Sequence, residues 1–320
     1  MEGMSKRVIL TKQIEEADIG SRLDAVTARH FKQFSRAHIQ RWIRGGELLL
    51  NNEKVKPRIL ISEGDVISIN AEDEIQLEDL PQNLPLDIIW EDDQVIVLNK
   101  PAGLVVHPGA GNRDGTLVNG LLYYNQEQGY LPRAGVVHRL DKDTSGIMVV
   151  AKTEVSYLNL VGQLKDRTVK REYLAVVVGE PLMGGTIDKP LGRHPKQRTK
   201  QAVIESGREA ITTYSVKEKL KGYSLLGASL KTGRTHQIRV HFSSIDLPIV
   251  GDALYGGKQK FATGTSDELR NELSKFPRQA LHAFSLSFLH PVTKEVITFT
   301  SPLPLDMIEL IDLLKVNATT

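Results

Sequence analysis

The sequence predicts an α+β protein with a small N-terminal module and a larger domain behind it. After residue 90, short apolar runs separated by Gly, Pro and polar turns outnumber the stretches with helical periodicity. Before residue 76, two helix-like segments are followed by short strand-like runs. A chain of 320 residues is long enough for two domains. We therefore expect a module over residues 15–75, an acidic linker over 76–89 and a main domain over 90–310.

Two helices are expected between residues 22 and 43 of the module. Ser35 is suited to cap the second helix, and Gly45-Gly46 would end it. Short strands should follow at 48–50 and 66–69. The apolar side chains that recur at helical spacing, and should form the core of the module, are Leu23, Val26, Ile39, Trp42 and Ile43.

The main domain should contain more strands than helices. Its expected strands are nearly continuous apolar runs, as in buried sheets: 95–100, 146–151, 173–178 and 223–230, with a strand end at 135–138. Its expected helices cover 117–122, 157–164 and 235–242.

The charge of the chain is unevenly distributed. The net charge is only +2, but residues 22–69 contain nine Lys/Arg against five Asp/Glu, and residues 189–208 contain six against one. Between them, residues 72–93 contain nine acidic residues and no basic ones. The two basic blocks are either solvated faces or cationic surfaces that bind a phosphate backbone.

The chain contains no cysteine, which excludes disulfides, thiolate metal sites and every mechanism that needs a thiol nucleophile. No apolar run is long enough to span a membrane, and the first 20 residues do not resemble a signal peptide. We therefore expect a cytoplasmic protein without membrane association.

Residues 139–145, Arg-Leu-Asp-Lys-Asp-Thr-Ser, form a short polar connection between two expected strands. Asp and Ser are common in ordinary turns because their side chains bind nearby backbone groups. A polar loop held by rigid strands is equally a common position for reactive side chains. The residues of this loop alone leave both interpretations open.

Three motifs in order resemble the RluA family of RNA pseudouridine synthases. Residues 138–146, His-Arg-Leu-Asp-Lys-Asp-Thr-Ser-Gly, resemble the signature of that family. Residues 170–175, Lys-Arg-Glu-Tyr-Leu-Ala, resemble the second motif, and residues 232–241 followed by 248–252 resemble the third. The resemblance extends over residues 90–304. It implies a catalytic domain with a mixed, largely antiparallel central sheet, flanking helices and Asp141 in a central cleft.

The N-terminal module resembles the S4 RNA-binding domain in residues 35–46 and 50–55. This resemblance implies an RNA-binding surface that is formed by the second helix and the following turn. Arg36, Arg41 and Arg44 would lie on this surface, with Lys54 near it. Lys196 and Arg198 would bind RNA from the second basic block, 189–208.

The resemblance implies that Asp141 is the catalytic carboxylate, which either attacks C1′ of the ribose or removes a proton from C2′. A cation should hold Asp141 ionised: Arg239 by family analogy, with Arg234 as the other candidate. Arg239 could instead contact phosphate. Tyr173 would stack on the flipped base and handle the proton that leaves C5.

The remaining candidates are substrate-binding residues. Arg139 would enter the space that the flipped nucleotide vacates, where a planar guanidinium can stack. His138, which begins the signature motif, and Arg234 are also expected to contact the RNA. No metal or other cofactor is expected, because the isomerisation requires none.

The expected substrate is large-subunit (23S) ribosomal RNA or the pre-ribosomal large subunit, and the expected state is a monomer. Two alternatives are another RNA, such as tRNA, and a non-catalytic RNA-binding factor in ribosome assembly. Other interpretations fit the residues less well. Asp141 and Asp143 are too close in sequence to flank a sugar as a glycosidase pair, and His236 with His241 lack a third metal ligand.

Overall fold

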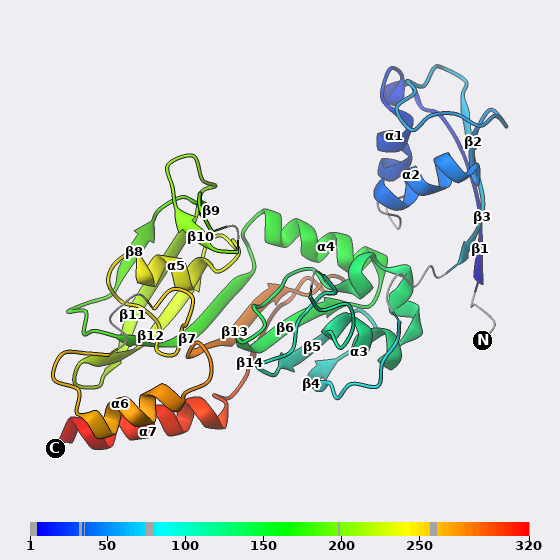
Figure 1. The fold of residues 1–320 in the computed structure, drawn as a ribbon. Helices are drawn as coiled ribbons and strands as arrows, with labels where there is room; N and C mark the ends of the chain where they lie inside the picture. The colour runs from blue at the N-terminus through cyan, green and yellow to red at the C-terminus, as the bar shows by residue number, and fades with distance from the viewer. Residues whose placement is uncertain are drawn as a thin grey trace.

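The computed structural model describes residues 5–31, 34, 36–74, 80–109, 111–197, 199–256 and 261–319, so Ser35 and Arg198 lie outside the described residues. The described chain contains separate hydrophobic clusters in the N-terminal module and in the main domain. Figure 1 shows the module apart from the larger domain. None of the described helices is both long and apolar enough to cross a lipid bilayer.

The N-terminal module is a three-stranded antiparallel sheet, in the order β1-β3-β2, covered by two helices. The predicted core residues of the helices are buried, with Ile39, Trp42 and Ile43 each at most 2% exposed. The elements of the module are β1 (Ser5–Gln13), η1 (Glu16–Asp18), α1 (Leu23–His30), α2 (Arg36–Gly45), β2 (Leu48–Leu50) and β3 (Val66–Glu74).

Two features of this module differ from the expectation. β1 was missed, because only Val8, Ile9 and Leu10 form an apolar run in a charged segment. β3 does not stop at residue 69 but continues into the acidic stretch, because β1 pairs with it along its whole length. Backbone pairing with a partner strand therefore overrides the linker-like composition of residues 72–74.

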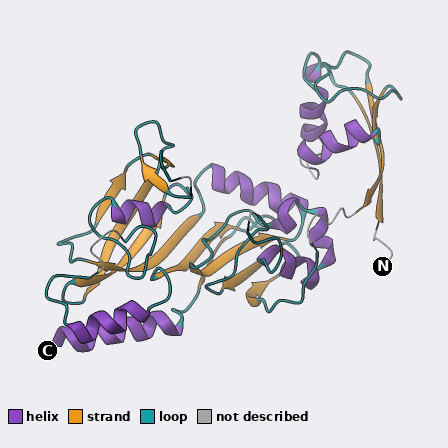
Figure 2. Ribbon diagram, viewed as in Figure 1, coloured by secondary structure: helices purple, strands orange, loops and turns teal. Residues whose placement is uncertain are grey.

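The main domain contains a mixed, largely antiparallel sheet of nine strands, as expected (Figure 2). The strand order is β4-β5-β6-β13-β7-β12-β11-β8, with β14 paired to β13, and only β13 and β6 are recorded as a parallel pair in the described chain. The strands are β4 (Asp87–Glu91), β5 (Val95–Lys100), β6 (Ser145–Ala151), β7 (Lys170–Val178), β8 (Gly185–Asp188), β11 (Ile211–Lys219), β12 (Tyr223–Leu230), β13 (Leu281–Leu289) and β14 (Val296–Thr300).

A two-stranded sheet, β9 (Leu191–Arg193) with β10 (Gln201–Val203), lies in the second basic block. We call residues 189–208 the arm. The helices of the main domain are α3 (Leu117–Tyr124), η2 (Gln126–Tyr130), η3 (Pro132–Gly135), α4 (Glu154–Lys165), α5 (Gln237–Ser243), α6 (Asp267–Lys275) and α7 (Leu305–Thr319). The sequence did not indicate α6 or α7, whose leucines join the main core.

Two expectations about the segments around the site were wrong. The strand end at 135–138 is instead the end of η3 followed by a single bridge between Val136 and Val150. β4 begins at Asp87, inside the segment that was expected to be a linker, because its backbone pairs with β5. Residues 146–151 do form a strand, and every residue of β6 is buried.

Candidate functional site

Asp141 lies in a loop that enters β6 from the buried residue Leu140. The loop begins as a turn, in which the Thr144 N–H donates to the Asp141 carbonyl at 3.1 Å. It ends at Gly146, which has φ 118° and packs so closely against β13 that a Cβ there would lie 2.2 Å from the Ala283 carbonyl oxygen. Only glycine allows both this φ and this approach, so Gly146 brings the loop against the centre of the sheet.

Buried polar side chains bind the backbone of this loop. Lys100, which is fully buried, donates through Nζ to the carbonyls of Pro101, Leu104 and Lys142 at 2.8–2.9 Å. Arg278 donates to the Asp143 carbonyl at 3.1 Å. A loop whose carbonyls are bound by buried cations is fixed in position, which a reactive carboxylate requires.

Burial lowers the pKa of Lys100 to about 7, although the nearby carboxylates of Asp143 and Asp141 act in the opposite direction. In its charged form the side chain has three N–H donors for the three carbonyls that surround it. Lys100 is therefore a structural group at the base of the loop, and its side chain does not reach solvent.

Arg239, on α5, pairs with two carboxylates. Its Nη1 donates to Asp141 Oδ2 at 3.0 Å, while its Nε and Nη2 donate to Asp252 at 2.8 and 2.9 Å. Burial opposes the charge of Arg239, but the hydrogen bonds and charge of Asp252, together with Asp141, raise its pKa above the ordinary value. The guanidinium therefore stays ionised and provides a fixed positive charge against Asp141.

Asp141 lies where two cavities of about 520 and 600 Å³ meet. Both volumes fall within the roughly 300–1,000 Å³ of typical ligand pockets. The residues that line both cavities are His107, Arg139, Leu140, Asp141, His236 and Arg239. The smaller cavity also contains Tyr173, His138 and Arg234, so the structure brings six of the sequence-predicted site residues together.

The smaller cavity is strongly cationic. Asp141 is the one acidic residue among the described residues that line it. The basic ones are Arg133, Arg139, Lys165, Arg167, Arg171, Lys231, Arg234 and Arg239. An excess of positive charge in a concave surface attracts polyanions.

The uncharged polar residues of this cavity are held in their neutral forms. Burial raises the pKa of Tyr173, which is 7% exposed on β7, and the charge of Asp141 adds to this effect. Burial lowers the pKa of His138 to about 3 and that of His107 to about 4. The Nε2 atom of His138 accepts a hydrogen bond from the Val149 N–H at 3.1 Å, which requires an unprotonated nitrogen.

Two buried nitrogens at the cavity have no hydrogen-bond partner within the described part of the chain: Nε2 of His107 and Nε of Arg171. Buried polar atoms normally have partners, because an unpaired one costs about 1–3 kcal/mol. Neither residue was given a role from the sequence, although Arg171 lies within the second motif, 170–175.

The other predicted RNA-binding residues that the structure describes lie outside the cavity. Arg41 and Arg44 are exposed on α2 of the N-terminal module, and Lys196 is exposed on the arm. Arg198 lies outside the described residues. Arg36 pairs with the buried Asp24 at 2.9 Å, so its positive charge is partly neutralised within the module.

The sequence analysis also missed the acidic partner of Arg239. Asp252 is 4% exposed and accepts hydrogen bonds from the Leu254 and Tyr255 N–H groups as well as from Arg239. Asp252 is the last residue of the third motif, and this position was the signal in the sequence that could have identified it. A buried arginine needs carboxylate partners, so an acidic residue in the same motif was a candidate.

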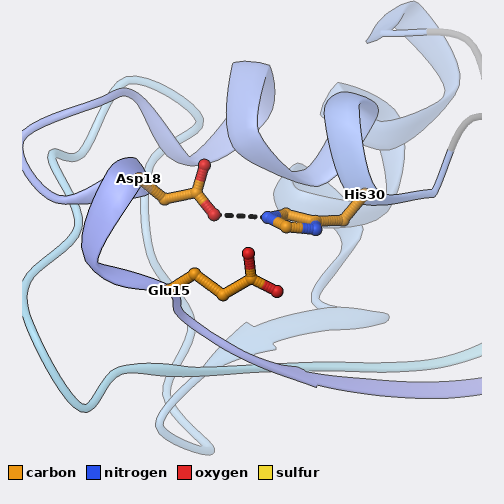
Figure 3. Close-up of side chains that lie close together, drawn as sticks. All are labelled: Glu15, Asp18 and His30. Atoms are coloured by element: carbon orange, nitrogen blue, oxygen red, sulfur yellow. Dashed lines mark hydrogen bonds and ion pairs between the residues drawn. The ribbon is translucent and has the colours of Figure 1, made fainter.

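Among the described residues, one group has the composition of a metal site: Glu15, Asp18 and His30 in the N-terminal module, with ligand atoms within 4.8 Å of one another (Figure 3). Asp18 is buried and already pairs with His30 and with Arg29, and Glu15 pairs with Lys12. The carboxylates therefore already have partners within the module, and the contacts of Asp18 tie η1 to α1.

Family models match two parts of the chain. The model of the RNA pseudouridylate synthases matches residues 94–244, and the model of the S4 domain matches residues 21–67. The first range contains the Asp141 loop, Tyr173 and Arg239, and the second contains α1 and α2.

Curated relatives cover nearly the whole chain. A ribosomal large subunit pseudouridine synthase D from Xanthomonas campestris is 50% identical over 302 residues, which cover 94% of this chain and 91% of the relative. A protein of the same name from Escherichia coli K12 is 45% identical over 315 residues, with 98% and 97% covered. The solved structure of human RNA pseudouridylate synthase domain containing 4 matches 72% of this chain and 93% of its own, at 25% identity and a TM-score of 0.57.

Proposed function

The chain belongs to the RNA pseudouridylate synthase family and contains an S4 domain, and from this premise we propose that it converts specific uridines of large-subunit ribosomal RNA to pseudouridine, with Asp141 as the catalytic carboxylate. The observation that carries the assignment of Asp141 is its position at the junction of two cavities, with the buried Arg239 3.0 Å away. The names of the relatives support ribosomal RNA as the substrate.

The reaction breaks the N1–C1′ bond of uridine, rotates the base and joins C5 to C1′. The C5 proton is lost and N1 gains one, so atoms and electrons balance without an oxidant, a reductant or a group donor. Asp141 would act on the ribose, either as a nucleophile at C1′ or as a base at C2′. Both routes require an ionised carboxylate, and Arg239 stabilises that form.

Tyr173 would bind the flipped base. Its ring lies at the cavity wall beside Asp141, and its raised pKa keeps the hydroxyl protonated at neutral pH. A planar ring beside a planar base favours stacking. After the new bond has formed, the hydroxyl would relay the C5 proton: its oxygen accepts that proton while its own proton passes to solvent.

Arg139 would take the place of the flipped nucleotide in the RNA. It is exposed and lines both cavities, so its guanidinium is accessible from the side on which RNA would approach. An extruded base leaves unstacked neighbours, and a guanidinium can stack on them. The unpaired Nε2 of His107 and Nε of Arg171 would contact the same nucleotide or its phosphates.

The S4 domain and the arm would hold the RNA outside the cavity. Arg41 and Arg44 in the domain, and Lys196 and Arg198 in the arm, are the residues that we assign to phosphate contacts. The exposed side chains of Arg41, Arg44 and Lys196, on two separate elements, suit a structured RNA, whose backbone can be contacted at several positions. We further propose that the protein acts as a monomer in the cytoplasm, which sedimentation and cell fractionation would test.

Tritium release from RNA labelled at C5 of uridine tests the proposal, because the new C5–C1′ bond expels that hydrogen. The wild-type protein should release tritium from 23S ribosomal RNA or large-subunit precursors and not from a tRNA transcript. Asp141→Asn should bind RNA normally and release none within detection. Asp143→Asn is the matched control from the same loop and should keep its activity within a few-fold.

The outcomes separate the alternatives. Release from tRNA alone would replace the proposed substrate and keep the reaction. Binding without release by the wild type would support a non-catalytic assembly factor instead. Full activity in Asp141→Asn would refute the assignment of the carboxylate.

A further inference from the structure

A chain of hydrogen bonds connects the arm to the neighbourhood of Asp141. The Gln201 N–H, in β10, donates to Oη of Tyr255 at 2.9 Å. The same oxygen lies 2.7 Å from Nδ1 of His236. The other ring nitrogen, Nε2 of His236, lies 3.8 Å from Oδ1 of Asp141. The oxygen of Asp141 that Arg239 does not bind therefore faces an imidazole.

The direction of these hydrogen bonds determines where His236 carries its proton. Because the Gln201 N–H already donates to the Tyr255 oxygen, the hydroxyl proton is free to be donated to His236. Within the described part of the chain, the hydroxyl has no further hydrogen-bond partner. If Nδ1 accepts that proton, a neutral ring carries its own on Nε2, which faces Asp141.

The protonation states of both residues suit this arrangement. Burial lowers the pKa of His236 and raises that of Tyr255, so the imidazole is neutral and the phenol is protonated at neutral pH. His236 precedes α5 in a left-handed conformation, with φ 56°. A non-glycine residue in this region is strained, and such strain is found where a side chain must be held in one direction.

Packing joins Tyr255 to the arm as well. Tyr255 belongs to a small apolar cluster with Leu191 of β9, Ala210 and Val240 of α5. The base of the arm is also bound to α5, because the Lys189 carbonyl lies 2.9 Å from Nε2 of His241. The arm, Tyr255 and the helix that follows His236 therefore pack as one unit beside the main core.

We propose that Tyr255 and His236 are positioning residues that connect the arm to Asp141. The Nε2–H of His236 then stabilises one orientation of the carboxylate, opposite the contact with Arg239. The distance of 3.8 Å closes to a hydrogen bond when the substrate fixes Asp141. The proposal rests on the proposed role of Asp141. RNA held by the arm would strengthen the connection that runs through Tyr255 and His236 to Asp141.

Substitutions at His236 separate this role from packing. His236→Gln can place an amide N–H close to the position of Nε2, whereas the shorter amide of His236→Asn reaches only the position of Nδ1 and leaves Asp141 without that donor. We expect His236→Asn to lower the single-turnover rate of tritium release about tenfold, less than the roughly 100–1,000-fold that follows the loss of a donor to the reacting oxygen itself, because His236 acts through Asp141. His236→Gln should stay within about threefold of the wild type, and the Kd for RNA should be unchanged in both.

A double-mutant cycle tests the connection to Tyr255. Tyr255→Phe should lower the rate about tenfold in the wild type and have no further effect in the His236→Gln variant, because Tyr255 acts through the imidazole. Gln201→Pro removes the N–H at the first residue of an edge strand, where proline is tolerated. As a single substitution, Gln201→Pro should lower the rate several-fold. Combined with Tyr255→Phe, it should cause no further loss of rate.

Equal losses in the two His236 variants, or an undiminished loss from Tyr255→Phe in the His236→Gln variant, would overturn the proposal. Full activity in Gln201→Pro would show that the arm has no part in positioning Asp141. Thermal unfolding of each variant identifies losses that come from misfolding. Failure of the proposed function gives a different result, since the wild type would then release no tritium or Asp141→Asn would still release it.

Discussion

Asp141 and Asp252 share one guanidinium: Arg239 donates through Nη1 to Asp141 and through Nε and Nη2 to Asp252. The two-point contact with the buried Asp252 fixes the plane of the guanidinium, and the remaining nitrogen is aimed at Asp141. The orientation of the cation therefore comes from an acidic residue outside the signature motif.

Arg239→Lys should lower turnover about 100-fold and weaken RNA binding little. A lysine keeps the charge but cannot bind both carboxylates with fixed geometry, and the loss of one or two charged hydrogen bonds corresponds to roughly 1.5–3 kcal/mol each. Single-turnover tritium release gives the rate. Arg234→Lys is the control, because among the described residues Arg234 Nε donates to the Glu209 carbonyl and not to Asp141; equal losses would count against the special role of Arg239.

Lys100→Met should destabilise the main domain by about 3 kcal/mol, because three buried carbonyls lose their donor. Turnover should fall with it, since the carbonyl of Lys142 in the Asp141 loop is released. Urea unfolding measures the first effect and tritium release the second. Lys142→Met, whose side chain is exposed in the same loop, should change stability by less than about 0.5 kcal/mol.

Stability should depend on pH through His138. Its pKa of about 3 lies well below the ordinary value, so between pH 6.5 and 3 the unfolded chain binds a proton that the folded chain does not. The stability that His138 contributes is complete above pH 6.5 and is lost as the pH falls, by at most about 1.4 kcal/mol per unit. His138→Gln keeps an acceptor for Val149 and does not titrate.

The free energies of unfolding of the wild type and His138→Gln should therefore approach each other or cross as the pH falls from 7 to 4. Urea titrations at intervals of half a pH unit measure this difference. A constant difference over the whole range would show that His138 does not carry the pH dependence.

RNA binding should weaken steeply with salt, and single neutralisations should reduce that dependence. Each lost phosphate contact lowers the slope of log Kd against log salt by about 0.7–0.9. We expect this for Arg44→Gln in the S4 domain and Lys196→Gln in the arm. Lys275→Gln on α6, where Lys275 pairs with Glu272, should leave the slope unchanged. Filter binding between 50 and 300 mM salt distinguishes the two groups.

Much of the fold could be predicted because its signals are local. The buried face of α2 follows from the spacing of Ile39, Trp42 and Ile43, and β6 follows from one continuous apolar run. β1 and the extension of β3 could not be predicted, because each exists by pairing with a strand more than 50 residues away. Composition indicates which segments can form a strand, but whether a strand forms there depends on the presence of a partner strand in the folded chain.

By itself the sequence determined which residue types are available at the site: a carboxylate in a polar loop, a tyrosine in an apolar strand and arginines in a third motif. The tertiary structure decided that Arg239, 98 residues from Asp141, pairs with it and that Arg234 does not. It also decided that Asp252, Tyr255 and His236 surround this pair. The reason is physical: partners and protonation states depend on burial and on distances between groups far apart in sequence, which periodicity and spacing do not contain.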